Sequence, residues 1–365
     1  MKKIFVIIIF LIFILSNFIT LANSIKKEKT ISDFSNILDN RYVSDKELKE
    51  LNMLSRISKW TFTTGRTSAT NRPIEELCGL IKPDDWKEYT NINDNFDPEE
   101  PYALPEKWDW REEYDLTQIR DQESCGSCWA FATVAPLESI IKINTGRDVD
   151  LSEQWLVSCN KNKWDCYGGW WAHDYHYNKE GKCGGIGAVL EIFFRYQAED
   201  LECRNYYPHS YLLKDIDSDG YSWNYISESE VPSVESIKNA IYKYGPISAG
   251  VYVSTAFRSY KSGVFNAHVN ETATHAITLT GWNDNLGANG VWFLRNSWGK
   301  DWGENGYMKI EYGCCNVGSW ACYIEGFETT FKSNFLKISA FNLIKDNLQK
   351  NLKMMSEAGF EPATS

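Results

Sequence analysis

The stretch that decides the fold is Gln122-Glu123-Ser124-Cys125-Gly126-Ser127-Cys128-Trp129-Ala130-Phe131. Apolar residues then continue at helical spacing through Leu137 and Ile141 until Gly146, so we predict a helix that Cys128 opens. A helix N-terminus carries partial positive charge and favours a thiolate. Position alone nevertheless favours a structural or disulfide-bonded Cys128, and the Cys125/Cys128 C-x-x-C pair is only a weak redox signal.

The second half of the chain has a different pattern. Ser152 is a good N-cap for one more short helix, and after Gly245-Pro246 come short runs of apolar and β-branched residues bounded by Gly, Asn and Asp. We predict strands at residues 247–254, 276–280, 291–294 and 306–310. A helical first half and a β-rich second half indicate an α+β fold with a seam, where active sites often lie.

Thiol catalysis needs a base near the sulfur and a group that orients the base. His275, one of five histidines, begins an apolar strand, and Asn296 lies in a loop after another strand. Taken singly, a histidine such as His275 is more often a structural residue with its hydrogen bonds made than a catalytic base. Asn296 taken singly is an ordinary turn residue.

Together these segments resemble the papain-like cysteine peptidase family. The Cys125–Trp129 stretch fits the family's Cys-Gly-[SerAla]-Cys-[TrpTyr] signature, and His275 follows Cys128 by 147 residues, within the expected range. Further matches are Leu151-Ser152-Glu153-Gln154, Cys166-Tyr167-Gly168-Gly169 and Asn296-Ser297-Trp298-Gly299. The resemblance covers residues 103–327. It implies a helical left subdomain and a β-barrel-like right subdomain with the active-site cleft between them.

The resemblance also implies roles for individual residues. Cys128 would be the nucleophile, His275 the base that forms a thiolate–imidazolium pair with it, and Asn296 the residue that orients the imidazole. Gln122 and the backbone N–H of Cys128 would form the oxyanion hole. Trp298 would shield the His275–Asn296 hydrogen bond, and Gly168 and Gly169 would pair with the substrate backbone.

A side-chain pocket is implied near Trp170, Trp171, Gly250, Thr274 and Ala276, which favours a bulky apolar or aromatic substrate residue. The family usually has Gly where Glu123 stands, so the effect of that carboxylate depends on whether it points to solvent.

The ten cysteines belong to this interpretation. The family pattern implies the disulfides Cys125–Cys166 and Cys159–Cys203. Cys322 is a plausible partner for Cys314 or Cys315, Cys183 has no assigned partner, and Cys78 falls in the pro-region. The sequence has no pair of C-x-x-C units, the spacing typical of a zinc site. Neither a metal nor a cofactor is expected.

The ends of the chain predict processing. Residues 1–23 read as a secretory signal peptide, or alternatively as an uncleaved membrane anchor. Residues 24–102 form an expected pro-region and linker with one modest helical pattern at residues 46–57, and residues 328–365 a tail of unknown role. A secreted or lysosomal/vacuolar monomer is expected, with peptide substrates and with its own pro-region and cystatin-like inhibitors as partners. The net charge of −11 argues against nucleic-acid binding.

Three functions compete at this point. The leading one is an active cysteine endopeptidase, or an exopeptidase if the unusual 178–225 stretch blocks one end of the cleft. The second is a non-catalytic papain-like binding or adhesion protein, which would usually lack the nucleophile or the histidine. The third is a thiol–disulfide oxidoreductase, which the missing βαβ pattern opposes.

Overall fold

The computed structural model describes residues 42–84, 86–87, 91–92, 104–160, 162–171, 189–203 and 222–325. The expected signal peptide, the C-terminal tail, Cys183 and most of the 178–225 stretch lie outside the described residues. Among the helices that are described, none has the length and apolarity needed to cross a membrane.

The central helix is α5 (Cys128–Thr145), which is buried along almost its whole length. It begins at Cys128 and ends at Gly146, whose φ of 71° is the left-handed conformation that glycine adopts readily. Helix α6 (Glu153–Cys159) follows, and the Ser152 side chain accepts a hydrogen bond from the backbone N–H of Trp155 at 3.0 Å. Helix α5 confirms both predicted ends, and α6 confirms the predicted start after Ser152.

The strands predicted in the second half of the chain lie in one sheet, which also includes strands from the first half. Within the described residues this sheet has ten strands, in the order β1-β6-β9-β8-β7-β5-β10-β4-β2 with β3 paired to β7. Their bounds are β1 Thr61–Thr64, β2 Asn91–Ile92, β3 Lys107–Asp109, β4 Ser222–Tyr225, β5 Ile247–Val251, β6 Tyr260–Phe265, β7 His275–Asn283, β8 Val291–Arg295, β9 Tyr307–Glu311 and β10 Ser319–Glu325. The remaining helices are α2 Asp45–Ile57, α3 Ile74–Leu77, α4 Trp110–Glu113, α7 Val234–Tyr244, α8 Thr255–Arg258 and the 3₁₀ turns Ser68–Asn71 and Cys314–Asn316.

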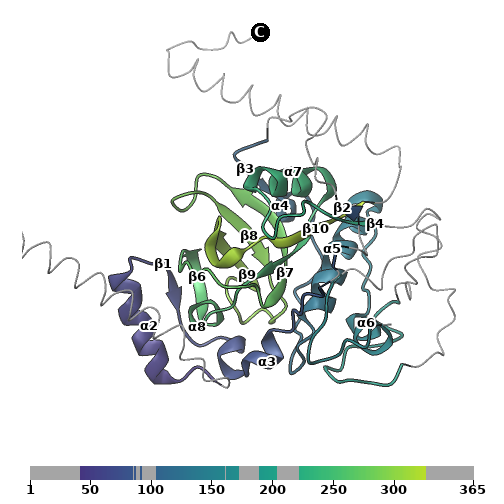
Figure 1. Ribbon diagram of the computed structural model, residues 1–365, viewed down its shortest axis with the longest axis horizontal. Coiled ribbons are helices and arrows are strands. Elements are labelled where there is room, and N and C mark those ends of the chain that lie inside the picture. The colour runs from purple at the N-terminus through teal and green to yellow at the C-terminus, as the bar shows by residue number, and fades with distance from the viewer. Residues whose placement is uncertain are drawn as a thin grey trace, which may run out of the picture.

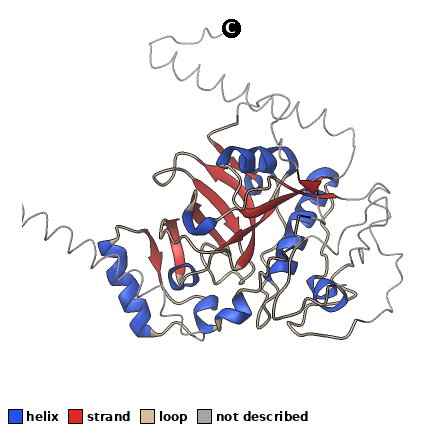
Figure 2. Ribbon diagram, viewed as in Figure 1, coloured by secondary structure: helices blue, strands red, loops and turns tan. Residues whose placement is uncertain are grey.

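The sheet forms the centre of the molecule, and helices lie around it. Figure 1 shows α5 and α6 beside the sheet, with α5 running next to β7 and β5. Figure 2 shows the same division by colour, with the red strands gathered in one body and the blue helices around it. The α+β prediction is therefore confirmed.

Part of the expected pro-region is integrated into this fold. Helix α2 begins with a capping box at Ser44 and contacts β1, which pairs antiparallel with β6 at one edge of the sheet. At the other edge β2 pairs in parallel with β4. In Figure 1 this purple and blue segment runs along the lower side of the molecule from β1 through α3 toward α5. Both terminal strands of the sheet thus come from residues that precede position 104.

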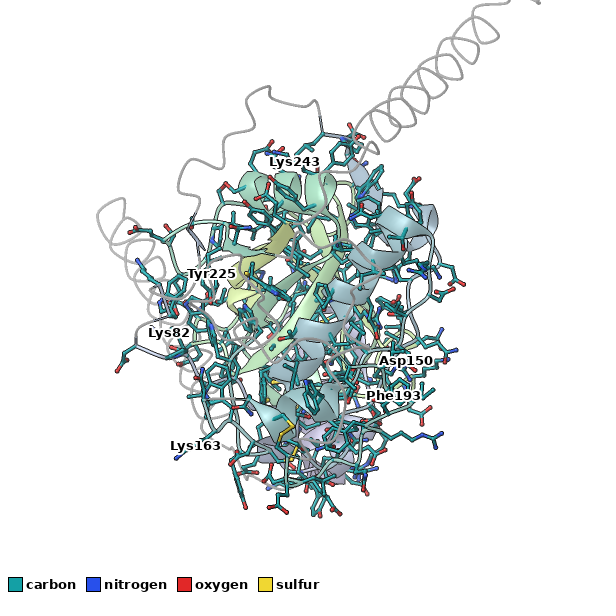
Figure 3. All side chains as sticks on the ribbon, turned by 90° about the vertical axis from the view of Figure 1, so that its right-hand side faces the viewer. Lys82, Asp150, Lys163, Phe193, Tyr225 and Lys243 are labelled. Carbon is teal, nitrogen blue, oxygen red and sulfur yellow. A yellow bond between two sulfur atoms is a disulfide. The ribbon has the colours of Figure 1, made fainter. Side chains whose placement is uncertain are left out.

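Both disulfides implied by the resemblance are present, Cys125–Cys166 and Cys159–Cys203. Yellow sulfur–sulfur bonds mark such links in Figure 3. The predicted bridge from Cys322 to the vicinal pair is wrong, since Cys314, Cys315 and Cys322 are all free thiols. Cys322 lies buried inside β10, opposite Tyr225 and Ser248, whereas Cys314 and Cys315 sit in the 3₁₀ turn before that strand.

The seam between helices and sheet contains a small cavity of about 20 Å³, lined among others by Glu138, Glu153, Arg295 and Asn296. Glu138 accepts a hydrogen bond from the Leu151 N–H at 2.8 Å. Burial raises the pKa of Glu138 to about 7, although Arg295 opposes the shift. Burial, Glu138 and Glu191 also raise the pKa of Glu153. Two neighbouring buried carboxyl groups therefore hold protons more tightly in the folded chain than in the unfolded one.

This cluster predicts a pH-dependent stability. Because the folded-state pKa of Glu138 lies above its ordinary value of 4.5, its contribution to stability is fully present below pH 4.5 and is lost as the pH rises toward about 7. The loss is at most about 3 kcal/mol. We expect the thermal midpoint of Glu138→Gln to fall less than that of the wild type between mildly acidic and neutral pH. Thermal denaturation of both chains across that range measures the difference, and parallel curves would contradict the assignment.

Candidate active site

The predicted nucleophile Cys128 is fully buried at the N-terminus of α5. Its Sγ accepts hydrogen bonds from the backbone N–H groups of Gly79, at 3.3 Å, and Ala276, at 3.4 Å. Ala276 is the neighbour of His275 on β7, so the strand places the predicted base next to the residue that contacts the sulfur, and His275 Nδ1 makes no hydrogen bond.

The His275 side chain is oriented as the resemblance implied. Its Nε2 lies 2.8 Å from Oδ1 of Asn296, which also accepts the Ser297 N–H at 2.8 Å. Because Oδ1 only accepts, Nε2 carries the hydrogen and Nδ1 is the nitrogen left to act as a base. The ring of Trp298 lies 4.6 Å from the imidazole and is itself fully buried, so it shields this pair from water.

The ionisation state differs from the predicted thiolate–imidazolium pair. Burial raises the pKa of Cys128 to about 11, even though backbone N–H groups from Ala276 and Gly79 favour the thiolate. Burial also lowers the pKa of His275 to about 4, against the effects of Asn296 and the Leu77 carbonyl. At neutral pH the covered site therefore holds a neutral thiol and a neutral imidazole. The cause is desolvation, which penalises both charged forms.

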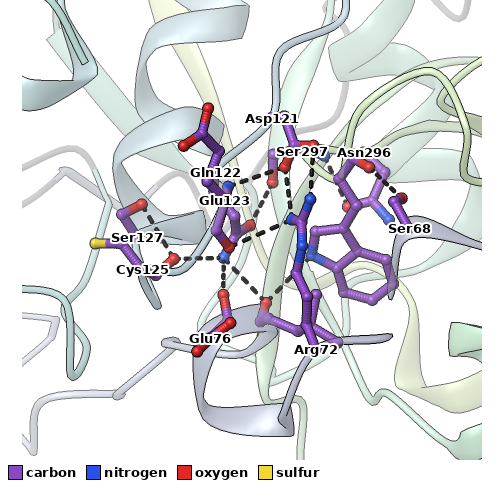
Figure 4. Close-up of polar contacts among 12 residues, drawn as sticks. Ser68, Arg72, Glu76, Asp121, Gln122, Glu123, Cys125, Ser127, Asn296 and Ser297 are labelled. Atoms are coloured by element: carbon purple, nitrogen blue, oxygen red, sulfur yellow. Dashed lines mark hydrogen bonds and ion pairs between the residues drawn. The ribbon is translucent and has the colours of Figure 1, made fainter. Parts of the chain in front are cut away.

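Gln122, the predicted oxyanion donor, is buried and fully engaged (Figure 4). Its Nε2 donates to the carbonyl oxygens of Glu76, at 2.8 Å, and Cys125, at 2.9 Å. Its Oε1 accepts from the Ser297 hydroxyl at 2.8 Å, which fixes the direction of the amide. A carbonyl oxygen from the pro-region thus already occupies the donor that the mechanism would use.

Glu123 is exposed, so its carboxylate does not enter the buried site. Its φ is 50°, a conformation in which Gly is unstrained, and this explains why Gly is usual there. The neighbouring Asp121 forms a bidentate ion pair with Arg72, at 2.6 and 2.7 Å (Figure 4). This pair links the expected pro-region to the rim of the site.

Residues 79–81 lie in the cleft as an extended peptide. The Gly169 N–H donates to the Gly79 carbonyl at 2.9 Å, and the Ile81 N–H donates to the Gly169 carbonyl at 3.0 Å, in a parallel arrangement. Gly168 approaches so closely that a Cβ there would lie 2.5 Å from the Ile81 side chain. Of the two glycines predicted to pair with a substrate backbone, Gly169 hydrogen-bonds to the chain's own peptide, whereas the Gly168 N–H donates to the Asp165 carbonyl and this glycine only packs against the peptide.

Leu80 shows which residues form the side-chain pocket. A Cβ on Gly250 would lie 3.2 Å from Cδ2 of Leu80 and 3.0 Å from Cβ of Ala273. Leu80 belongs to the same buried apolar cluster as Trp170, Trp171, Ala276 and Trp320. Trp171 is fully buried and stacks on Trp170 at 4.3 Å, so it backs the wall of the pocket.

Sequence reasoning missed Trp320 and the pro-region residues. Trp320 has a φ of 49° beside a register shift in β10, which no local pattern predicts. Its ring meets Trp170 at 5.4 Å. Gly79 is the sequence feature that could have indicated this segment, because a glycine allows the close approach to Gly126 that takes the chain over the sulfur. Within the described residues no group of three or more His, Cys, Asp or Glu is arranged to hold a metal ion.

Comparison with known proteins agrees with this geometry. Residues 104–325 match the family described as "Papain family cysteine protease". The chain is 36% identical over 231 residues to oryzain gamma chain of Oryza sativa subsp. japonica, covering 60% of this chain and 59% of that protein. It is 31% identical to ananain of Ananas comosus over 261 residues, covering 69% and 70% of the two chains.

A solved structure shows the same fold with its pro-region. The digestive procathepsin L2 proteinase from Tenebrio molitor larval midgut superposes with a TM-score of 0.64 at 25% sequence identity, covering 82% of this chain and 99% of that one. The cysteine at the N-terminus of α5, the His275–Asn296 pair and these similarities lead to one assignment. The chain belongs to the papain family of cysteine proteases.

Proposed function

We propose that this chain is the latent form of a cysteine endopeptidase that hydrolyses peptide bonds through Cys128 and His275. The observation that carries the proposal is a peptide lying across the nucleophile. Residues 79–81 are hydrogen-bonded to Gly169, and the Gly79 N–H points at the sulfur. The cleft binds an extended peptide over Cys128, and Asn296 orients the His275 ring. This arrangement fits peptide hydrolysis better than it fits redox chemistry or adhesion.

In this proposal the reaction begins when the pro-region leaves. Solvent then reaches Cys128 and His275, the desolvation that suppresses both charges falls, and the proton moves from sulfur to imidazole. The thiolate attacks the substrate carbonyl carbon while Gln122 and the Cys128 N–H hold the oxyanion. His275 next gives its proton to the leaving amine, and water hydrolyses the thioester with His275 as base.

The geometry also supports latency. Gly79 presents its N–H to the sulfur, not its carbonyl carbon, so the covering peptide is bound in a pose that cannot be attacked. In the same segment, the Glu76 carbonyl accepts from Gln122, the Gly79 carbonyl accepts from the Gly169 N–H, and Arg72 forms an ion pair with Asp121. Release of this segment is the proposed activating step, with cleavage near residue 102.

The proposal includes passage through an oxidising secretory compartment. Two disulfides in one chain of this kind are typical of such compartments. The signal peptide at residues 1–23 is the sequence feature that supports it.

An active-site-directed epoxide tests the proposal directly. The full chain is activated at mildly acidic pH with reductant, treated with the epoxide and digested for peptide mapping. We expect the label on Cys128 and a parallel loss of peptide hydrolysis. Hydrolysis that survives full labelling of Cys128 would reject the assignment, and so would a chain that binds peptides without cleaving them.

Replacing Gln122 with alanine tests the oxyanion hole. Removal of one such donor usually lowers kcat by ~10²–10³, because the developing charge loses a preorganised partner. We expect that loss with little change in KM, measured by steady-state kinetics on the activated enzyme. Gln154, another fully buried glutamine, offers a control in Gln154→Ala. An unchanged rate in Gln122→Ala would remove Gln122 from the mechanism.

The pocket around Leu80 predicts substrate preference. A substrate leucine in that pocket buries its side chain against Gly250, Ala273 and the tryptophan cluster, which is worth about 1.5–3 kcal/mol. We expect kcat/KM to fall roughly 10- to 100-fold when that leucine is replaced by glycine in a peptide series. Equal values for both peptides would contradict the pocket.

A further inference from the structure

Cys78 places a second thiol beside the nucleophile. It follows α3 and precedes Gly79, whose N–H lies 3.3 Å from Sγ of Cys128. Only the carbonyl carbon separates the Cys78 Cα from that nitrogen, so this Cα lies within about 6 Å of the Cys128 sulfur. In a disulfide the Cα of one cysteine and the sulfur of the other are three covalent bonds apart, roughly 4 Å, so a closing movement of at most about 2 Å brings the two residues to bonding distance.

The two sulfurs are chemically available to each other. Both are free thiols, Cys128 fully buried and Cys78 half-buried. Cys128 lies close enough to act electrostatically on Cys78, whose pKa is raised by burial and by Cys128.

Burial raises the pKa of the Cys78 thiol well above its ordinary value, and two neighbours act against this shift. Its thiol is hydrogen-bonded to the side chain of Thr274, the residue before the catalytic histidine. The buried guanidinium of Arg258, held by the carbonyls of Ala69 and Arg72, favours its thiolate. A thiolate is the species that attacks a disulfide.

We propose that Cys78 and Cys128 form a disulfide that covalently locks the pro-region over the active site. This rests on the proposed function only in that the lock would keep a peptidase latent. The oxidant is a small-molecule disulfide such as glutathione disulfide. The bond would make activation require a reductant as well as removal of the covering peptide.

The exchange balances in two steps. The more accessible Cys78 loses its proton and attacks one sulfur of the oxidant, forming a mixed disulfide and releasing a thiolate that takes up that proton. Cys128 loses its proton and attacks the Cys78 sulfur, which breaks the mixed disulfide and releases the second thiolate, again protonated. Two cysteine thiols are thereby oxidised by two electrons, and one disulfide is reduced to two thiols.

Cys315 is the competing partner that an experiment must exclude. Both Cys78 and Cys315 act electrostatically on Tyr252, so the vicinal pair lies in the same region. The Cys315 sulfur, however, faces the Ala267 carbonyl at 3.3 Å and lies 3.9 Å from the Cys314 sulfur. It is therefore engaged away from the cleft, whereas Cys78 is held next to Cys128 by the bound peptide.

The test uses the full chain with its pro-region intact, equilibrated in an oxidising glutathione buffer, blocked with an alkylating agent and mapped by mass spectrometry. We expect a Cys78–Cys128 linked peptide, lighter by two hydrogens than the two thiol peptides together, in the wild type and in Cys315→Ser. We expect none in Cys78→Ser. Activation at acidic pH should need a reductant in the wild type and in Cys315→Ser but not in Cys78→Ser.

Absence of the linked peptide under conditions that form Cys125–Cys166 would overturn the proposal, as would a Cys78–Cys315 link. If Cys78→Ser does not fold, the wild-type and Cys315→Ser maps still decide. Peptide hydrolysis is measured separately after reduction and removal of the pro-region. Hydrolysis without the link rejects the lock alone, and the link without hydrolysis rejects the proposed peptidase alone.

Discussion

Replacing Cys128 with alanine is expected to lower kcat for peptide hydrolysis by on the order of 10⁶-fold, the size of effect seen when a hydrolase loses its nucleophile. The alanine side chain can form no thioester, and His275 alone has no acyl acceptor to activate. Binding through Gly169 and the Leu80 pocket involves neither the sulfur nor its charge, so peptide affinity should change little.

The matched control is Cys322→Ala, which removes the same atom from another fully buried free cysteine. Steady-state kinetics and thermal denaturation on both variants separate a chemical defect from a folding defect. If the two variants lose activity to the same degree, Cys128 is not the nucleophile.

Replacing Gly79 with alanine should relieve latency. A Cβ there would lie 1.6 Å from the carbonyl oxygen of Gly126 and 2.5 Å from its carbonyl carbon, and both are backbone atoms that cannot turn aside. The segment must move out, which breaks its hydrogen bonds to Cys128 and Gly169. Three such bonds at about 0.5–1.5 kcal/mol each amount to roughly 100-fold weaker occupancy of the cleft.

We therefore expect the unprocessed Gly79→Ala chain to hydrolyse a small peptide roughly 100-fold faster than the unprocessed wild type at neutral pH with reductant present. Gly65→Ala is the control, because a Cβ at Gly65 meets only the flexible Lys261 side chain, at 3.3 Å. Turnover is followed before any cleavage is visible on a gel. Equal residual activity in the two variants would show that residues 79–81 do not keep the enzyme latent.

Local features of the fold were predictable because their causes are local. The helix that begins at Cys128 ends at Gly146 because glycine alone adopts the required conformation without strain, and Ser152 caps α6 through its own hydroxyl. The short apolar runs became β5, β7, β8 and β9. The predicted catalytic set of Cys128, His275, Asn296 and Gln122 came from motif resemblance, and the fold brings all four together.

Features that depend on contacts between distant segments were not predictable. The Cys322 pairing was wrong because strand register, not spacing along the chain, decides which sulfurs meet. The bulge at Trp320 depends on how β10 pairs with β5, and the place of Leu80 in the pocket depends on the path of the pro-region.

The nucleophile shows both kinds of control. The sequence determined that Cys128 opens a helix, that a histidine stands at the right distance along the chain, and that an asparagine is available to orient it. Only the tertiary structure decided that Gly79 covers the sulfur and that both members of the pair are uncharged in the covered state. The reason is physical: a residue type sets what a side chain is able to do, whereas its protonation and its neighbours depend on burial, which arises only when segments far apart in the chain pack together.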